Sequence, residues 1–241
     1  TTELISGSCQ AYLQRTEDYY INPQGNAFSL AGTIHHNKLE DSASSGMMAE
    51  LSLEYKGITG IVDLYDNKSK TLIDYKNTGS YKASQILGLQ STEEEHPTEV
   101  YKRGGRWGAK GSPKIIKVFY RDPATADFGD WGWQINFYRL MLEENGYDVN
   151  DMYLQMTIRD GGVHAAKSRG VYDNIYLVEV PYINNEVLKR KFLDKRDILI
   201  SSLETKTVPT MCTPEETWDG RKCESYCPVR EVCPYMENNN E

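Results

Sequence analysis

Two carboxylates and a lysine lie on neighbouring segments of this chain that both have the pattern of β-strands. Asp63 belongs to the first apolar run, and Asp74 and Lys76 belong to the next, residues 71–76. The polar residues 66–69 between the runs favour a turn, so the sequence predicts a hairpin. Side chains alternate along a strand, so Asp74 and Lys76 leave the same face, and pairing can bring Asp63 beside Asp74. Carboxylate oxygens suit Mg²⁺ or Mn²⁺, and a nearby lysine can offset charge that develops on a phosphate.

The hairpin alone is a weak indication, because Asp-x-Lys often occurs by chance in exposed turns. Two further groups strengthen it. Upstream, His36 follows Gly32 by four residues in a segment predicted to begin a helix, and a neutral imidazole is a common metal ligand. Downstream, Gln134 and Tyr138 are four residues apart in a helix predicted over 127–145, so they share one face. The chain therefore carries Gly-x3-His, Gly-x2-Asp, Asp-x-Lys and Gln-x3-Tyr in this order.

This order of motifs resembles the PD-(D/E)XK nuclease superfamily, specifically its RecB-like branch. That branch includes AddB-type nuclease domains, exonuclease V and the CRISPR-associated adaptation nucleases. The resemblance covers the chain from Cys9 to Cys233. The resemblance implies His36 and not His35, because the spacing from Gly32 to His36 is that of the family. A core or capping role fits His35 better, and Glu40 receives no ligand role. The resemblance implies that the metal ligands are His36, Asp63, Asp74 and the carbonyl of Tyr75, and that the catalytic residues are Asp63, Asp74, Lys76, Gln134 and Tyr138.

The same resemblance implies an α/β fold, with a mixed central sheet flanked by helices in a restriction-endonuclease-like core. It implies a Mg²⁺- or Mn²⁺-dependent phosphodiesterase that hydrolyses DNA, with exonuclease action on single-stranded ends and little sequence specificity as the leading interpretation. Two alternatives remain open. One is a sequence- or structure-specific endonuclease of the same superfamily, and the other is a non-catalytic DNA-binding module that retains the fold. A homo-oligomer, or partner proteins of recombination or CRISPR adaptation, would fit this class.

A basic segment, residues 101–121, follows an acidic stretch over 91–99 that contains Pro97 and is predicted to be a loop. The segment has seven lysines and arginines and no acid, whereas the chain has a net charge of −8, which argues against a general nucleic-acid coat protein. We expect the segment to be a flexible, glycine-rich loop, and a basic loop with an aromatic residue can follow a phosphate backbone and stack on an unpaired base. A merely solvated loop is the alternative. The expected DNA contacts are Lys102, Arg103, Arg106, Trp107, Lys110 and Tyr138, assisted by Lys167 and Arg169.

Four of the five cysteines fall in the last thirty residues, as Cys212-x10-Cys223-x3-Cys227-x5-Cys233. Such clustering favours metal binding over disulfides, and four thiolates can hold either Zn²⁺ or an iron–sulfur cluster. The resemblance implies a [4Fe–4S] cluster on Cys9, Cys223, Cys227 and Cys233, although its usual spacing in the C-terminal triplet is x2 then x5. Cys212 is the alternative to Cys9 as the fourth ligand, and zinc is the alternative to the cluster.

The length of 241 residues fits one sizeable domain, or one domain with a small appendage. We expect a nuclease domain over 1–208, a cysteine-rich module over 209–236 that closes onto the N-terminal helix, and a disordered tail over 237–241. The chain has no run of 18 apolar residues and no signal-peptide pattern, so an intracellular, cytoplasmic location is expected. The other predicted elements are helices over 3–18, from 29 to 40 and over 184–206, and strands over 49–55, 151–160 and 174–182. Within the first of these helices, residues 6–8 are equally suited to be a helix cap.

Overall fold

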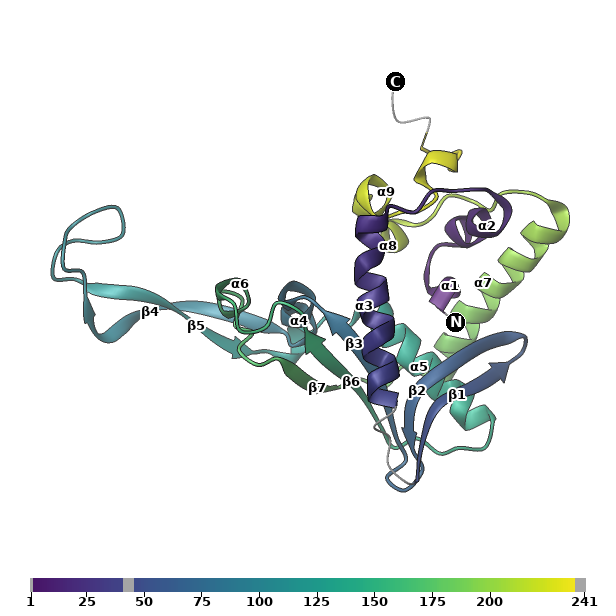
Figure 1. Ribbon diagram of the computed structural model, residues 1–241, viewed down its shortest axis with the longest axis horizontal. Coiled ribbons are helices and arrows are strands. Elements are labelled where there is room, and N and C mark those ends of the chain that lie inside the picture. The colour runs from purple at the N-terminus through teal and green to yellow at the C-terminus, as the bar shows by residue number, and fades with distance from the viewer. Residues whose placement is uncertain (1, 41–45, 237–241) are drawn as a thin grey trace. The chain divides into compact units, whose positions relative to one another are not determined.

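Figure 1 shows the computed structural model, which describes residues 2–40 and 46–236. The predicted disordered tail, 237–241, lies outside the described residues. None of the helices in the described part of the chain combines the length and apolar character needed to cross a lipid bilayer. In chain order the elements are α1 (Thr2–Ile5), α2 (Ser8–Thr16), α3 (Pro23–Glu40), β1 (Met47–Tyr55), β2 (Ile58–Asp66), β3 (Thr71–Thr78), α4 (Ser80–Ile86), β4 (Leu89–Val100), β5 (Pro113–Arg121), η1 (Pro123–Thr125), α5 (Gly129–Glu144), β6 (Asp151–Ile158), α6 (His164–Lys167), β7 (Ile175–Glu179), α7 (Asn185–Thr205), α8 (Pro214–Thr217), α9 (Arg221–Ser225) and η2 (Arg230–Val232).

The chain divides into two compact units. The first consists of Thr1–Tyr75, Gly129–Tyr153 and Glu179–Glu241, and the second of Lys76–Phe128 and Leu154–Val178. This division does not test the boundary expected after residue 208, which remains a prediction.

Five strands form one mixed sheet in the order β1-β2-β3-β6-β7. β2 pairs antiparallel with both β1 and β3, and Leu64 of β2 lies opposite Ile73 of β3. Helices α3 and α5 both pack against β2. The expectation of an α/β fold with a mixed sheet flanked by helices is confirmed.

The turn between β2 and β3 is held by Asp66. Its Oδ1 accepts a 2.9 Å hydrogen bond from the Lys68 backbone N–H, and its Oδ2 accepts a 2.7 Å bond from the Ser69 hydroxyl. A short acidic side chain that bonds to the backbone two residues later stabilises such turns. The predicted hairpin therefore forms where its turn residues indicated.

The core of the first unit includes the contact between α5 and α7. Phe137 of α5 stacks on Phe192 of α7, with ring centroids 3.9 Å apart, and the ring of Tyr55 meets Phe137 edge-on at 6.3 Å. The side chain of Asn184 caps α7 by accepting a hydrogen bond from the Glu186 backbone. Burying an aromatic ring of this kind contributes about 1.5–3 kcal/mol. Both helices agree with their predicted ranges to within two residues.

Two predictions were wrong. The stretch 91–99 is not a loop, because it belongs to β4, and residues 113–121 of the basic segment are not a loop either, because they form β5. The two strands pair from Leu89 opposite Arg121 to Glu95 opposite Ile115. The register of the pair shifts between Glu95 and Val100. Pro97 lies within this irregularity, where its lack of a backbone N–H costs no hydrogen bond between the strands. The N-terminal segment forms two helices, as the alternative of a cap at residues 6–8 allowed, because Gly7 between them has extended backbone angles (φ −63°, ψ 143°) and is the N-cap of α2.

Candidate active site and cysteine cluster

Helix α3 brings His36 to the β2–β3 hairpin. Nδ1 of His36 lies 3.5 Å from Oδ2 of Asp63, and the rings of His36 and Tyr75 meet edge-on at 6.2 Å. The same Asp63 oxygen accepts a 2.7 Å hydrogen bond from the backbone N–H of Tyr75. Burial, followed by the charge of Asp63, raises the pKa of the Tyr75 phenol. Asp63 is therefore oriented by a helix upstream of it and by the strand that follows it.

His36, the residue selected by its spacing from Gly32, is the histidine that meets Asp63. The ring of His35 lies 6.4 Å from that of His36, and burial, with a smaller effect of His36, lowers the pKa of His35. The side chain of Glu40, which was given no ligand role, lies outside the described part of the structure.

Asp74 lies opposite Asp63 when the register of the hairpin, Leu64 with Ile73, is continued by one residue. Directly opposed residues of an antiparallel pair project from the same face. Asp74 is only 2% exposed, and a carboxylate that is this buried is costly unless other groups or a cation stabilise it. Lys76, two residues along β3, leaves the strand on the same face as Asp74 and is half-buried.

Gln134 and Tyr138 are both buried on α5, and Nε2 of Gln134 donates a 3.0 Å hydrogen bond to the Tyr138 hydroxyl. The predicted pairing on one helix face is therefore present. The neighbouring Arg139 is used differently, since it bonds Glu143 at 2.8 Å and stacks on the ring of Tyr182. Catalytic roles for Gln134 and Tyr138 remain a prediction.

His36 and Asp63 suit a shared hard cation. Two neighbouring ligands of Mg²⁺, each at about 2.1 Å, lie about 3 Å apart, and the 3.5 Å between Nδ1 and Oδ2 is close to that value. Within residues 2–40 and 46–236, no three His, Cys, Asp or Glu side chains are already arranged as a complete metal site. Side-chain adjustment, with Asp74 and the Tyr75 carbonyl as further donors, would be needed to complete one.

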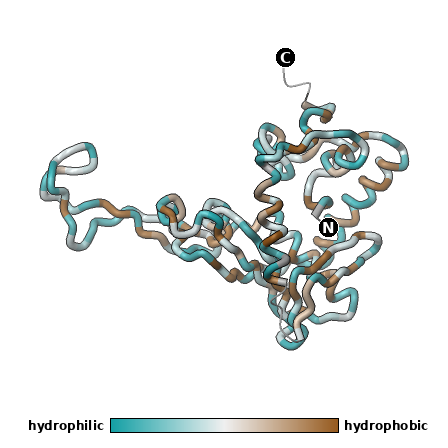
Figure 2. The backbone as a smooth tube through the Cα atoms, viewed as in Figure 1, coloured by the Kyte–Doolittle hydropathy of each residue, from teal (hydrophilic) through white to brown (hydrophobic). Residues whose placement is uncertain are grey.

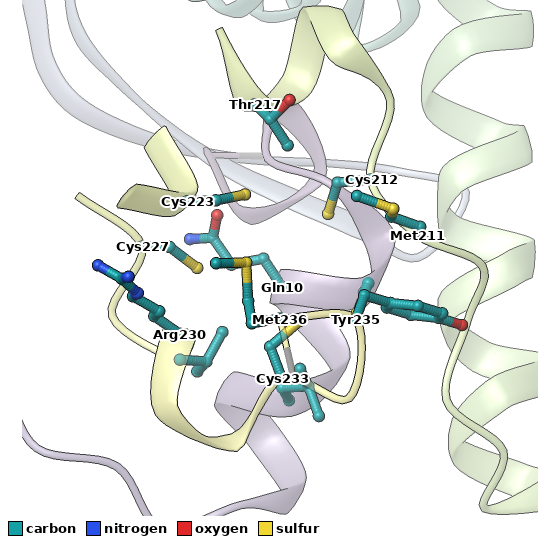
Figure 3. A pocket seen from close by; sticks show the side chains of 13 residues that line it. Gln10, Met211, Cys212, Thr217, Cys223, Cys227, Arg230, Cys233, Tyr235 and Met236 are labelled. Atoms are coloured by element: carbon teal, nitrogen blue, oxygen red, sulfur yellow. The ribbon is translucent and has the colours of Figure 1, made fainter. Parts of the chain in front are cut away.

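All five cysteines line one cavity in the first unit (Figure 3). Cys9 comes from α2, Cys212 from the segment before α8, Cys223 from α9, and Cys227 and Cys233 from either side of η2. The wall beside them is apolar and includes Leu13 of α2 and Val229, so the C-terminal segment packs directly on the N-terminal helix. Thiolates are the donor type that zinc and iron–sulfur clusters take. As at the hairpin, no three of the described cysteines are already grouped closely enough to hold a metal, so the side chains would have to move together.

Cys212 lies against the first turn of α2. Gly7, at the N-cap of that helix, has no side chain, and a Cβ at this position would overlap the Cys212 sulfur. A hydrogen bond with Cys9, helped by one from the Gln10 backbone, lowers the pKa of Cys212 to about 6. The bond with Cys212 and burial raise the pKa of Cys9. The Cys212 sulfur thus takes the place of the missing N-cap side chain.

Charged side chains also join the two ends of this unit, and no pattern in the sequence indicated them. Lys195 of α7 forms a 2.6 Å ion pair with Glu216 of α8, and its ammonium donates to the carbonyl oxygens of Ile5 and Ser6 at 3.3 and 3.0 Å. Partners that lie 190 residues apart in the chain, as Lys195 and Ile5 do, cannot be identified from local spacing. Together with the cysteine cavity, these contacts hold α8 and α2 close to α7.

The residues expected to contact DNA lie in the second unit, apart from Tyr138. Lys102, Arg103, Arg106, Trp107 and Lys110 are all exposed in the connection between β4 and β5. Arg169, expected to assist them, donates a 2.8 Å hydrogen bond to the Ser80 hydroxyl and lies 3.8 Å from Asp160, and its contact with DNA stays a prediction. It stabilises the start of α4, and Lys167 ends α6.

No protein-family model matches the sequence, and no curated protein matches it. Among solved structures, the fold is similar to a crystal structure from Eubacterium rectale of a protein to which exonuclease activity is ascribed. The sequences are 10% identical and the TM-score is 0.33, with 87% of this chain and 57% of that chain covered. The chain thus spans somewhat more than half the length of that protein. A similarity of this size leaves function to be argued from the residues themselves.

Proposed function

We propose that this protein is a metal-dependent DNA nuclease, and in particular an exonuclease that acts on single-stranded ends with little sequence specificity. The observation that carries the proposal is the meeting of His36, Asp63 and the Tyr75 backbone at one hairpin. Asp74 and Lys76 flank Tyr75 on the same strand. Two carboxylates, an imidazole and a lysine are a donor set suited to phosphodiester hydrolysis.

The ligands of a Mg²⁺ or Mn²⁺ ion would be His36, Asp63, Asp74 and the carbonyl of Tyr75. Such an ion, when bound, polarises the scissile phosphate and acidifies a water molecule. The chain itself supplies orientation and charge. The backbone N–H of Tyr75 fixes the Asp63 carboxylate, and Lys76 would offset the negative charge that grows on the phosphate.

The helix and the cysteines have supporting roles in this proposal. Gln134 and Tyr138, bonded to each other, would contact the DNA strand and the lysine. A [4Fe–4S] cluster would be held by Cys9, Cys223, Cys227 and Cys233, with Cys212 as the alternative to Cys9 and zinc as the alternative metal. The cluster would join α2 to the C-terminal segment, because its ligands come from both.

The test compares active-site variants with matched variants on the same hairpin. Asp74→Asn and Lys76→Ala should each reduce cleavage of end-labelled single-stranded DNA by about 100-fold or more in Mg²⁺ or Mn²⁺. Asp66→Asn and Lys68→Ala, which change the same residue types in the turn, should leave the rate unchanged. Circular dichroism of each variant checks that the buried substitution at Asp74 leaves the fold intact. Wild-type turnover by folded Asp74→Asn would overturn the proposed site.

The products separate the alternatives. Mononucleotides or short oligonucleotides released from a labelled end indicate an exonuclease, whereas internal fragments of a closed circular single strand indicate an endonuclease. A wild-type protein that binds DNA and cleaves neither substrate with either metal would be the non-catalytic module.

A further inference from the structure

The connection between β4 and β5 is an ordered structure in its own right. We call residues 101–112 the hairpin tip. Hydrogen bonds between the backbones of Gly105 and Gly108, at 3.0 and 3.2 Å, close a turn of two residues. The base of the tip is closed by Tyr101, which bonds Ser112 at 3.0 Å and Gly111 at 2.9 Å through its backbone. The Tyr101 ring fills the space beside Gly108, where a Cβ would overlap it.

Arg106 and Trp107 are the two residues at the corner of this turn. Trp107 is 76% exposed, and the Arg106 guanidinium lies 5.3 Å from the centre of its indole ring. Exposing a large aromatic ring to water forfeits the free energy that its burial would give. A ring held at the corner of a turn, with a cation beside it, is suited to stacking on a flat partner.

Within the β4–β5 hairpin, the tip and the strands differ in how their positive charges are balanced. Its four cations, Lys102, Arg103, Arg106 and Lys110, are accompanied by no acidic residue in the tip. No acidic side chain in the described chain, residues 2–40 and 46–236, forms an ion pair with the last three of them. On the strands the charges are matched instead, because Lys114 pairs with Glu99 at 2.7 Å and Lys117 lies opposite Glu93. Figure 2 shows the tip in teal to white, the colours of hydrophilic and intermediate residues, as expected of a segment in contact with solvent.

We propose that the hairpin tip binds single-stranded nucleic acid, with Trp107 stacked on an unpaired base and the tip cations on the adjoining phosphates. An indole ring reaches a base face only where the base is unpaired, because both faces are covered in a duplex. Binding need not involve the catalytic residues. The inference rests on the proposed function only in taking the bound strand to be the substrate of the nuclease.

Fluorescence anisotropy without divalent metal, in EDTA, measures this binding separately from cleavage. The probes are a labelled 20-nucleotide single strand and a duplex of the same length, at several NaCl concentrations. A tip variant, Arg103→Gln with Arg106→Gln and Lys110→Gln, should flatten the slope of log K against log salt by about two units for the single strand. The control, Lys114→Gln with Lys117→Gln and Arg121→Gln, loses the same three charges from β5 and should change the slope little.

Trp107→Ala tests the stacking contact. It should weaken single-strand binding by about 5- to 100-fold, leave the salt slope unchanged and leave the weaker duplex binding as it was. Equal slope changes in the tip and control variants, or full affinity in Trp107→Ala, would overturn the proposal. So would displacement of the single strand by polyglutamate as effectively as by unlabelled DNA.

Failure here is distinguishable from failure of the nuclease proposal. Unchanged binding by the tip variants, together with loss of cleavage in Asp74→Asn, would reject the tip and retain the enzyme. If the wild-type protein cleaves nothing but its DNA binding is weakened by the tip substitutions, the nuclease proposal is rejected and the binding role of the tip is retained.

Discussion

The backbone N–H of Tyr75 donates a 2.7 Å hydrogen bond to Oδ2 of Asp63, across the β2–β3 hairpin. The bond orients the carboxylate of Asp63, on β2, from β3, the strand that carries Asp74. The positions of both acids of the proposed site therefore depend on this hairpin. His36 approaches the same oxygen from α3. A carboxylate oriented by its neighbours before a cation arrives requires less ordering when the cation binds.

The variant Asp63→Asn should distinguish the effect of the side chain's orientation from the effect of its negative charge. The amide oxygen can still accept the bond from Tyr75, but the negative charge that attracts a cation is lost. We expect Mn²⁺ affinity, measured by calorimetry, to fall by more than about tenfold while the metal-free protein unfolds at nearly the same temperature. Asp66→Asn is the matched control and should keep wild-type affinity. Unchanged Mn²⁺ affinity in Asp63→Asn would exclude Asp63 as a ligand.

The cysteine cavity should hold iron. Protein purified without oxygen should be brown and contain about four irons per chain if the group is a [4Fe–4S] cluster. Cys9→Ser should lose the colour and Cys212→Ser should keep it if Cys9 is the fourth ligand. The opposite pattern would establish the C-terminal set, and one zinc per chain without colour would exclude the cluster.

Gly7→Ala should destabilise the first unit, because the added methyl group overlaps the Cys212 sulfur. Overpacking of this kind costs about 1–3 kcal/mol of unfolding free energy, measured by urea denaturation. Gly32→Ala is the control. A methyl group added to this helical glycine would meet nothing within 4 Å, so the change should be neutral or slightly stabilising. Wild-type stability in Gly7→Ala would show that Cys212 can move away from α2.

Asp160 should make the second unit sensitive to acid. Its carboxylate accepts 2.6 Å hydrogen bonds from the hydroxyl and the backbone N–H of Ser80. The pKa of Asp160 is lowered, and the hydrogen bond from the Ser80 hydroxyl is the largest cause. A lowered pKa in the folded state means that the stabilisation is complete above the unfolded pKa of about 3.9. It is lost as the pH falls through the lower, folded value.

Asp160→Ala should therefore cost about 0.5–2 kcal/mol at pH 7, as the loss of a helix cap does, and this difference should vanish in strong acid. Thermal unfolding between pH 2 and pH 7 measures both. Asp173→Ala, an exposed acid of the same unit, is the control and should follow the wild type at every pH. A difference that persists unchanged at pH 2 would contradict the assignment.

The sequence determined the elements whose signals are local. The β2–β3 hairpin followed from apolar alternation and the Asp66 turn, and its register, continued by one residue, places Asp63 opposite Asp74. Helices α5 and α7 followed from apolar periodicity, and the pairing of Gln134 with Tyr138 from the four-residue repeat of a helix. These features depend on residues close together in the chain, so their spacing was sufficient.

Only the tertiary structure decided the features that join distant segments. The acidic stretch 91–99 is a strand because β5 supplies its hydrogen bonds, which its own composition could not reveal. Cys212 reaches the start of α2, far from it in the chain, because Gly7 leaves room there. His36 was selected by spacing, but its contact with Asp63 depends on how α3 packs against β2. Local spacing fixes which face a side chain occupies, whereas the partner on that face is fixed by packing between segments that the chain order does not bring together.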